Sequence, residues 1–172
     1  MKDMLVQVEP LIPALRRYAR ALMRDRAAAD DLVQDCLERA VSRWHQRRDG
    51  SVRAWLFTIL HNLAVTQFRQ TTARGRHMSI DDAGEQELVS AAAQEQRLIY
   101  RDVLSRLARL PEEQRAVLLL VAVEDLSYAD AAKVLGVPVG TVMSRLSRAR
   151  ERLQQEMDGA GLGNVVALRS LK

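Results

Sequence analysis

Apolar residues recur at helical spacing along nearly the whole chain, except for one long interruption between residues 71 and 93. Before it, Leu32, Cys36 and Ala40 follow each other at four-residue steps, and after it Leu146 and Leu153 continue another such series. This is the period of one face of an α-helix. An interruption of roughly 20 residues is common between domains and rare inside one. The pattern predicts an all-α protein of two small helical domains joined by a flexible linker.

Helix formers dominate the composition, and the 172 residues include only four Pro and eight Gly. Proline is favoured in the first turn of a helix, so we expect the first helix to start near Pro10. The expected helices cover residues 10–23, 28–47, 52–70, 94–109, 111–121, 127–135 and 139–157. The predicted parts are an N-terminal domain at 1–70, an acidic linker at 71–94, a C-terminal domain at 95–157 and a loose tail at 158–172.

Arginine accounts for nearly all of the basic charge, since the 26 Lys and Arg residues include only three Lys. The charges are also segregated. Residues 41–77 hold seven Arg and one Asp, whereas residues 78–102 hold six acids and two Arg. Arginine recognises phosphate and guanine through two parallel hydrogen bonds. Segregated basic segments therefore favour a polyanionic partner.

Several classes of protein are excluded by what the sequence lacks. No apolar stretch is long enough to span a bilayer, and the first residues do not resemble a signal peptide, so we expect a cytoplasmic protein. Cys36 is the lone cysteine, and the three His residues are scattered, which excludes a disulfide and disfavours a metal site. No glycine-rich phosphate loop and no catalytic triad stands out. We expect no cofactor and no enzymatic activity.

The segment Leu126–Leu153 has the pattern of a helix-turn-helix: a short helix, a turn at Gly136 and a longer arginine-rich helix. Ser127 is expected to cap the start of the short helix, and Gly136 is expected to end it. In the longer helix one face is apolar, and the opposite face carries Thr141, Ser144, Arg145, Arg148 and Arg152. Hydroxyls and guanidinium groups bind phosphates and purine edges in the major groove. The alternative for this face is a helical hairpin with a solvated basic surface.

At this point the resemblance to a family becomes specific. Four short segments carry it: Leu110-Pro111, Leu126-Ser127-Tyr128, Gly140-Thr141-Val142 and Ser144-Arg145-Leu146. They resemble region 4 of bacterial sigma-70 family sigma factors of group 4, the extracytoplasmic-function (ECF) family. The resemblance implies that the longer helix reads the −35 promoter element. This chain has Met143 where the family usually has a basic residue.

A second motif lies in the N-terminal half. The segment from Ala29 to Asp35 resembles region 2.2 of the same family, which docks on the clamp helices of the polymerase beta-prime subunit. By helical spacing, one polar face is shared by Asp31, Gln34, Asp35 and Glu38. The resemblance implies that this face binds core RNA polymerase. The alternative is an acidic face that only meets solvent.

The segment from Arg53 to Arg69 resembles regions 2.3 and 2.4, which melt the −10 element in this family. Stacking surfaces combined with cations suit a single strand. We expect Arg53, Asn62 and Arg69 to face DNA, and we expect Trp55 to belong to the core.

Together the motifs cover about residues 5–155 and imply a sigma factor that directs promoter-specific initiation of transcription. The implied partners are core RNA polymerase, through the beta-prime clamp helices and the beta flap, promoter DNA and an anti-sigma factor. Two alternatives stay open. One is a sigma-like mimic that sequesters an anti-sigma factor, and the other is a stand-alone helix-turn-helix regulator.

Overall fold

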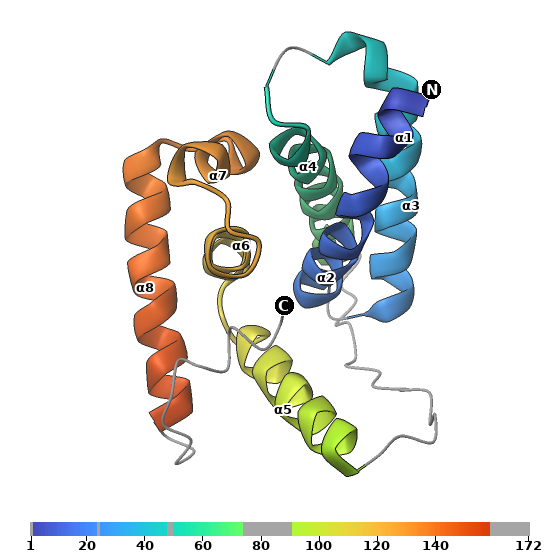
Figure 1. Ribbon diagram of the computed structural model, residues 1–172. Coiled ribbons are helices and arrows are strands. Elements are labelled where there is room, and N and C mark those ends of the chain that lie inside the picture. Colours follow the sequence, from blue (N-terminus) through green and yellow to red (C-terminus); the bar gives the residue numbers. More distant parts are fainter. Residues whose placement is uncertain (1, 24, 48–49, 74–90, 159–172) are drawn as a thin grey trace.

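The computed structural model describes residues 2–23, 25–47, 50–73 and 91–158. Every regular element in these ranges is helical (Figure 1), which confirms the predicted all-α class. The N-terminal unit contains α1 (Lys2–Val8), η1 (Glu9–Leu11), α2 (Ile12–Met23), α3 (Arg26–Arg43), η2 (Trp44–Gln46) and α4 (Val52–Ala73). The C-terminal unit contains α5 (Ala91–Leu107), α6 (Glu112–Leu118), η3 (Leu119–Val123), α7 (Tyr128–Leu135) and α8 (Val139–Asp158).

The core of the N-terminal unit lies where α2, α3 and α4 pack together. Leu15, Leu22 and Leu60 are completely buried there. The rings of Tyr18 and Phe57 meet edge to face with centroids 5.4 Å apart, a geometry that aromatic pairs favour. Three helices and one continuous apolar core therefore fix the positions of the outer faces of α3 and α4.

The start of the first helix was predicted wrongly. The chain is already helical from Lys2, and Pro10 lies in the η1 turn between α1 and α2. A proline lacks the N–H of the α-helical ladder and so interrupts it. Helix α1 forms before the interruption because its Met4 and Val8 are buried against the bundle.

Local signals set several helix ends as predicted. The Ser127 hydroxyl accepts a hydrogen bond from the Asp130 N–H and caps α7. Gly136 closes the same helix with φ of +64°, a conformation that disfavours any side chain. Helix α4 continues to Ala73, past the predicted end, and the hydroxyls of Thr71 and Thr72 donate to carbonyl groups one turn back.

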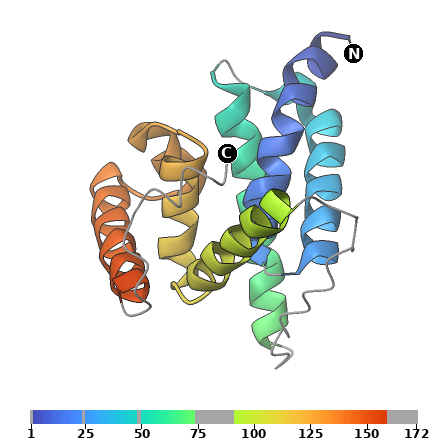
Figure 2. The ribbon, with the colours of Figure 1, turned by 60° about the horizontal axis from the view of Figure 1, so that its bottom comes forward.

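The two units pack against each other. Helix α2 contacts α6 and η3, and α4 contacts α7. Helix α8 lies on the far side of α6 from α2 and α3 (Figure 1, Figure 2). The predicted linker falls mainly on residues 74–90 and the tail on 159–172, which lie outside the described residues. Within the described helices, none is long and apolar enough to cross a membrane.

Candidate functional site

The helix-turn-helix is formed by α7, the turn at residues 136–138 and α8. The predicted apolar stripe of α8 is confirmed, because Val142, Leu146, Ala149 and Leu153 are all buried. The predicted polar residues share one arc of the helix, which adjoins the apolar stripe and does not lie opposite it as predicted: Thr141, Ser144, Arg145, Arg148 and Arg152. The packing of the stripe therefore fixes which side of α8 is presented to a partner.

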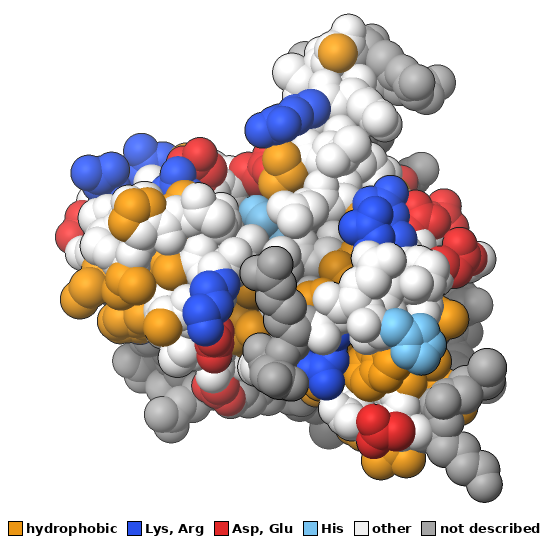
Figure 3. Space-filling model, turned by 90° about the horizontal axis from the view of Figure 1, so that it is seen from above, with side chains coloured by type: hydrophobic (Ala, Val, Ile, Leu, Met, Phe, Trp, Pro, Cys, Tyr) orange, Lys and Arg blue, Asp and Glu red, His pale blue; other side chains and the backbone are white. Residues whose placement is uncertain are grey.

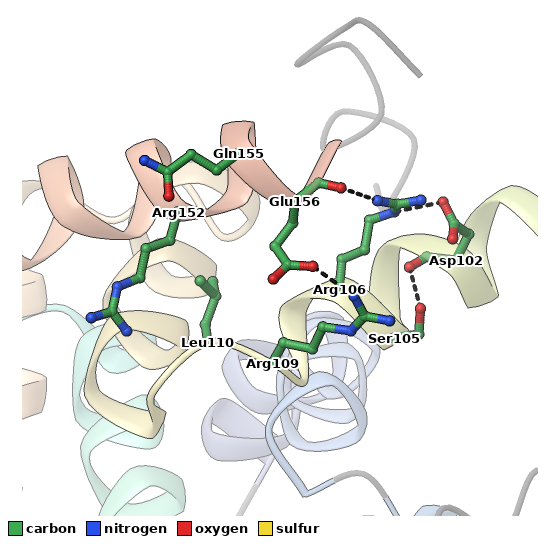
Figure 4. Close-up of a pocket in the computed structure, with 8 residues that line it drawn as sticks. All are labelled: Asp102, Ser105, Arg106, Arg109, Leu110, Arg152, Gln155 and Glu156. Carbon is green, nitrogen blue, oxygen red and sulfur yellow. Dashed lines mark hydrogen bonds and ion pairs between the residues drawn. The ribbon is translucent and has the colours of Figure 1, made fainter. Parts of the chain in front are cut away.

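The three arginines of that arc differ in their surroundings. Arg145 is 22% exposed and pairs with Glu113 on α6 at 2.9 Å. Arg148 is exposed and has no hydrogen bond or ion pair among the described residues. Arg152 is also exposed and lines a hollow beside Arg109, which pairs with Glu156 at 2.7 Å (Figure 4). Arg148 and Arg152 can therefore bind a partner without breaking an ion pair, whereas Arg145 cannot.

The acidic face of α3 is fully formed. Asp31, Gln34, Asp35 and Glu38 are all exposed and lie on one side of the helix. The opposite side, with Leu32, Val33 and Cys36, is buried. Gln34 donates to Glu38, whereas Asp31 and Asp35 form no hydrogen bond or ion pair among the described residues. Two carboxylates with free hydrogen-bonding capacity thus project from a rigid helix.

The three residues of α4 that were predicted to face DNA do not form one face. Asn62 and Arg69 are exposed and lie seven residues apart on one side of the helix. Arg53 is nine residues before Asn62, which places it on the opposite side. Trp55 is only half-buried, and its ring packs against Trp44 with centroids 6.0 Å apart. The structure brings Asn62 and Arg69 together and separates Arg53 from them.

Arg53 instead meets a residue that sequence reasoning missed. Its Nη2 donates to both the side chain and the backbone carbonyl of Glu124, at 2.9 and 2.8 Å. The Glu124 side chain is fully buried. In the sequence, Glu124 directly follows the apolar run from Val117 to Val123. This position next to the run was the one feature of the sequence that could have indicated that Glu124 is buried.

A cavity of about 680 Å³ opens between α4 and the C-terminal unit. Its lining includes Arg69 and His61 from α4, Glu112 and Glu113 from α6 and Arg145 from α8. The predicted −10 residue Arg69 and the predicted −35 residue Arg145 therefore border the same space. Figure 3 shows the molecule from above. On the face seen there, basic side chains are interspersed with acidic and uncharged ones and form no continuous basic stripe.

His61 is a buried polar residue within the α2–α4 packing. Its Nδ1 shares a hydrogen bond of 3.0 Å with the Tyr18 hydroxyl. Burial, with a smaller contribution from the positive charge of Arg145, lowers the pKa of His61 to about 4. The imidazole is therefore neutral at pH 7, and its role is structural.

Protonation of His61 should destabilise the fold in acid. Its pKa is about 6.5 in the unfolded chain and about 4 in the folded one, so the unfolded state binds the proton first. The contribution to stability is complete above pH 6.5 and is lost as the pH falls toward 4. We expect the free energy of unfolding to decrease by about 2 kcal/mol between pH 7 and 5 from this group. Urea unfolding followed by circular dichroism measures it.

His61→Gln, which keeps a hydrogen-bonding side chain, should remove that part of the pH dependence. His45→Gln is the matched control because His45 is exposed. If the two variants show the same pH dependence as the unchanged chain, His61 does not titrate as described.

Comparison with known proteins agrees with this geometry. Residues 8–61 match the model described as the Sigma2 domain of PhyR, and residues 100–153 match the model described as Sigma-70, region 4. The chain is 38% identical over 155 residues to the ECF RNA polymerase sigma factor EcfG of Rhodopseudomonas palustris, covering 87% of this chain and 83% of that protein. It is 36% identical over 139 residues to the ECF sigma factor SigC of Mycobacterium tuberculosis, covering 77% and 72%.

Solved structures give the same result. The sigma factor RpoE of Bartonella quintana, in complex with the anti-sigma factor NepR, matches with a TM-score of 0.77 and 33% identity over 92% of this chain and 98% of that one. CnrH, in complex with the cytosolic domain of CnrY, matches with a TM-score of 0.70 and 29% identity over 92% and 89%. The two helical units, their order and these relatives agree, and the chain belongs to the ECF RNA polymerase sigma factor family.

Proposed function

We propose that this chain is the specificity subunit of a bacterial RNA polymerase, which binds the core enzyme and directs it to promoters through their −10 and −35 elements. The observation that carries the proposal is the coexistence of two opposite surfaces on one chain. Helix α3 presents exposed carboxylates, and α8 presents exposed hydroxyls and arginines. Acidic groups repel DNA and arginines attract it, so the first surface suits a protein and the second suits a promoter.

The core enzyme would bind at the acidic face of α3, through Asp31, Gln34, Asp35 and Glu38, with the clamp helices of beta-prime as the counterpart. Because α3 is held on α2 and α4 by buried residues, the face needs no rearrangement to dock. We also propose that the C-terminal unit contacts the beta flap. The polymerization chemistry would belong to the core enzyme, and this chain would act with it in the cytoplasm as a non-catalytic subunit.

Promoter DNA would meet two sets of residues. Asn62 and Arg69 of α4, with Arg53 at the start of the same helix, would contact the −10 region. Thr141, Ser144, Arg145, Arg148 and Arg152 of α8 would contact the −35 region. In this structure the two units pack against each other, an arrangement called closed below, and Arg53 and Arg145 form ion pairs with Glu124 and Glu113. Both contacts therefore require that the side chains exchange an internal carboxylate for DNA.

An anti-sigma factor is the third proposed partner. The solved relatives RpoE and CnrH were each captured in complex with a second protein, the anti-sigma factor NepR and the cytosolic domain of CnrY. A chain of the same fold offers the same kind of surface. Co-purification of this chain with a candidate anti-sigma factor, followed by loss of core binding, would support the assignment.

Run-off transcription tests the main proposal. Purified core polymerase is incubated with this chain and a genomic promoter library, and specific transcripts that need the chain are expected. A second candidate function is the sigma-like mimic, which is favoured by the match of residues 8–61 to a PhyR domain and by the resemblance to the PhyRSL–NepR complex (TM-score 0.61, 27% identity). A mimic would bind an anti-sigma factor and give no transcripts.

A further inference from the structure

Glu124 holds the two units together from the loop after η3. Its carboxylate accepts hydrogen bonds from Arg17 Nε at 2.8 Å and Arg17 Nη2 at 2.9 Å, so the guanidinium binds it in a fork. Arg53 Nη2 donates to the same carboxylate at 2.9 Å. The carboxylate side chain is fully buried, whereas the two arginine side chains keep 24% and 35% of their exposure. The acid therefore comes from one unit and both cations from the other.

The two arginines are positioned for an anion by their own unit. Arg17 lies on α2 and Arg53 in the first turn of α4, and these helices pack together. The Arg53 guanidinium also lies over the Phe57 ring, 5.4 Å from its centroid, which restricts its orientation. Both cations would therefore stay near each other if the C-terminal unit moved away. Two adjacent guanidinium groups without an anion form a strong site for one.

A phosphodiester fits this site by the same chemistry as Glu124. Like a carboxylate, it carries one negative charge over two terminal oxygens, and arginine binds both groups in a fork. A phosphodiester and Glu124 cannot occupy the fork at the same time. Because the paired carboxylate is buried, it leaves the site only if the loop after η3 separates from α2 and α4.

We propose that Arg17 and Arg53 form a binding site for a backbone phosphate of DNA, and that Glu124 occupies this site when the two units are closed. Phosphate binding and closure then compete for the same two guanidinium groups. The inference rests on the proposed function for the identity of the nucleic acid as promoter DNA. It adds Arg17 to the DNA contacts and assigns Arg53 a phosphate contact, which agrees with its position on the opposite side of α4 from Asn62.

The test measures binding of a fluorescent single-stranded oligonucleotide, (dT)12, to the full chain by anisotropy at several salt concentrations. Glu124→Gln keeps the size of the side chain and removes its charge. We expect it to bind (dT)12 about tenfold more tightly, because the fraction of chains with an open site increases. Its radius of gyration from small-angle X-ray scattering should also increase. Glu9→Gln, at an exposed position, controls for the change in net charge.

A second set of variants identifies the site. In the Glu124→Gln background, Arg17→Ala combined with Arg53→Ala should abolish the gain in affinity. It should also reduce the slope of log K against log salt by about 0.7, the value for one lost phosphate contact to a single strand. Circular dichroism checks that each variant is folded.

Two results would overturn the proposed phosphate site. If Glu124→Gln gains no more affinity than Glu9→Gln, Glu124 does not compete with DNA and the proposal is overturned. If the gain persists without Arg17 and Arg53, the phosphate binds elsewhere and the proposal is again overturned. Run-off transcription tests the proposed function and does not depend on the (dT)12 measurement. If no promoter gives a transcript but the variants shift (dT)12 binding as expected, the phosphate site stands and only its use at promoters fails.

Discussion

Replacing Asp31 and Asp35 together with arginine should weaken binding to core RNA polymerase by about 100-fold or more. Both carboxylates are exposed on one face of α3, so the change reverses the charge of the proposed docking surface by four units. Loss of one charged partner at an interface costs about 2–5 kcal/mol, and like charges add a further penalty. Each 1.4 kcal/mol corresponds to about tenfold in affinity. Pull-down of purified core enzyme measures the effect.

The fold should survive this change, because neither carboxylate forms a hydrogen bond or ion pair with another described residue. Asp3→Arg combined with Glu9→Arg is the matched control, since it makes the same change in charge at exposed positions in α1 and η1. The control should bind core enzyme normally. Equal binding by the Asp31/Asp35 variant and the unchanged chain would refute the docking surface.

Local features of this fold could be read from the sequence because they depend on nearby residues. The Ser127 cap and the Gly136 terminus of α7 were predicted by the bonding and conformational needs of single residues. The buried stripe of α8 was predicted by helical spacing alone. The spacing of Asp31 and Asp35 likewise indicated one shared face of α3, and the structure places it outward.

The contacts between the units could not be read in the same way. The bond between Arg17 and Glu124 joins residues 107 positions apart, and no local pattern reports such a pairing. Arg53 and Asn62 were both expected to face DNA because of their motif, but nine residues correspond to two and a half helical turns, which places them on opposite sides of α4. Arg145 was grouped with Arg148 by spacing, yet only Arg145 has an acidic neighbour, Glu113, in reach.

This difference between Arg145 and Arg148 leads to the second large expected effect. Arg148→Ala should lose about 1–3 kcal/mol of binding to the cognate −35 duplex and much less on a scrambled duplex, if its guanidinium binds a guanine edge. Arg148 can reach DNA without breaking an internal contact, because it is exposed and forms no hydrogen bond or ion pair among the described residues. Arg145→Ala should lose less, since Arg145 must first leave Glu113, a pair worth up to about 1 kcal/mol.

Arg152→Ala should behave differently from Arg148→Ala, because Arg152 lies eleven residues after Thr141, nearer the C-terminal end of α8. A phosphate contact there should weaken binding to the cognate and scrambled duplexes alike and reduce the salt slope by about 0.9. The measurement is anisotropy with the full chain and both duplexes at several salt concentrations. Equal losses on the two duplexes for Arg148→Ala would show that Arg148 only positions the helix. Specificity at the −35 element would then have to arise from the shape of the DNA, which α8 would read through the phosphates.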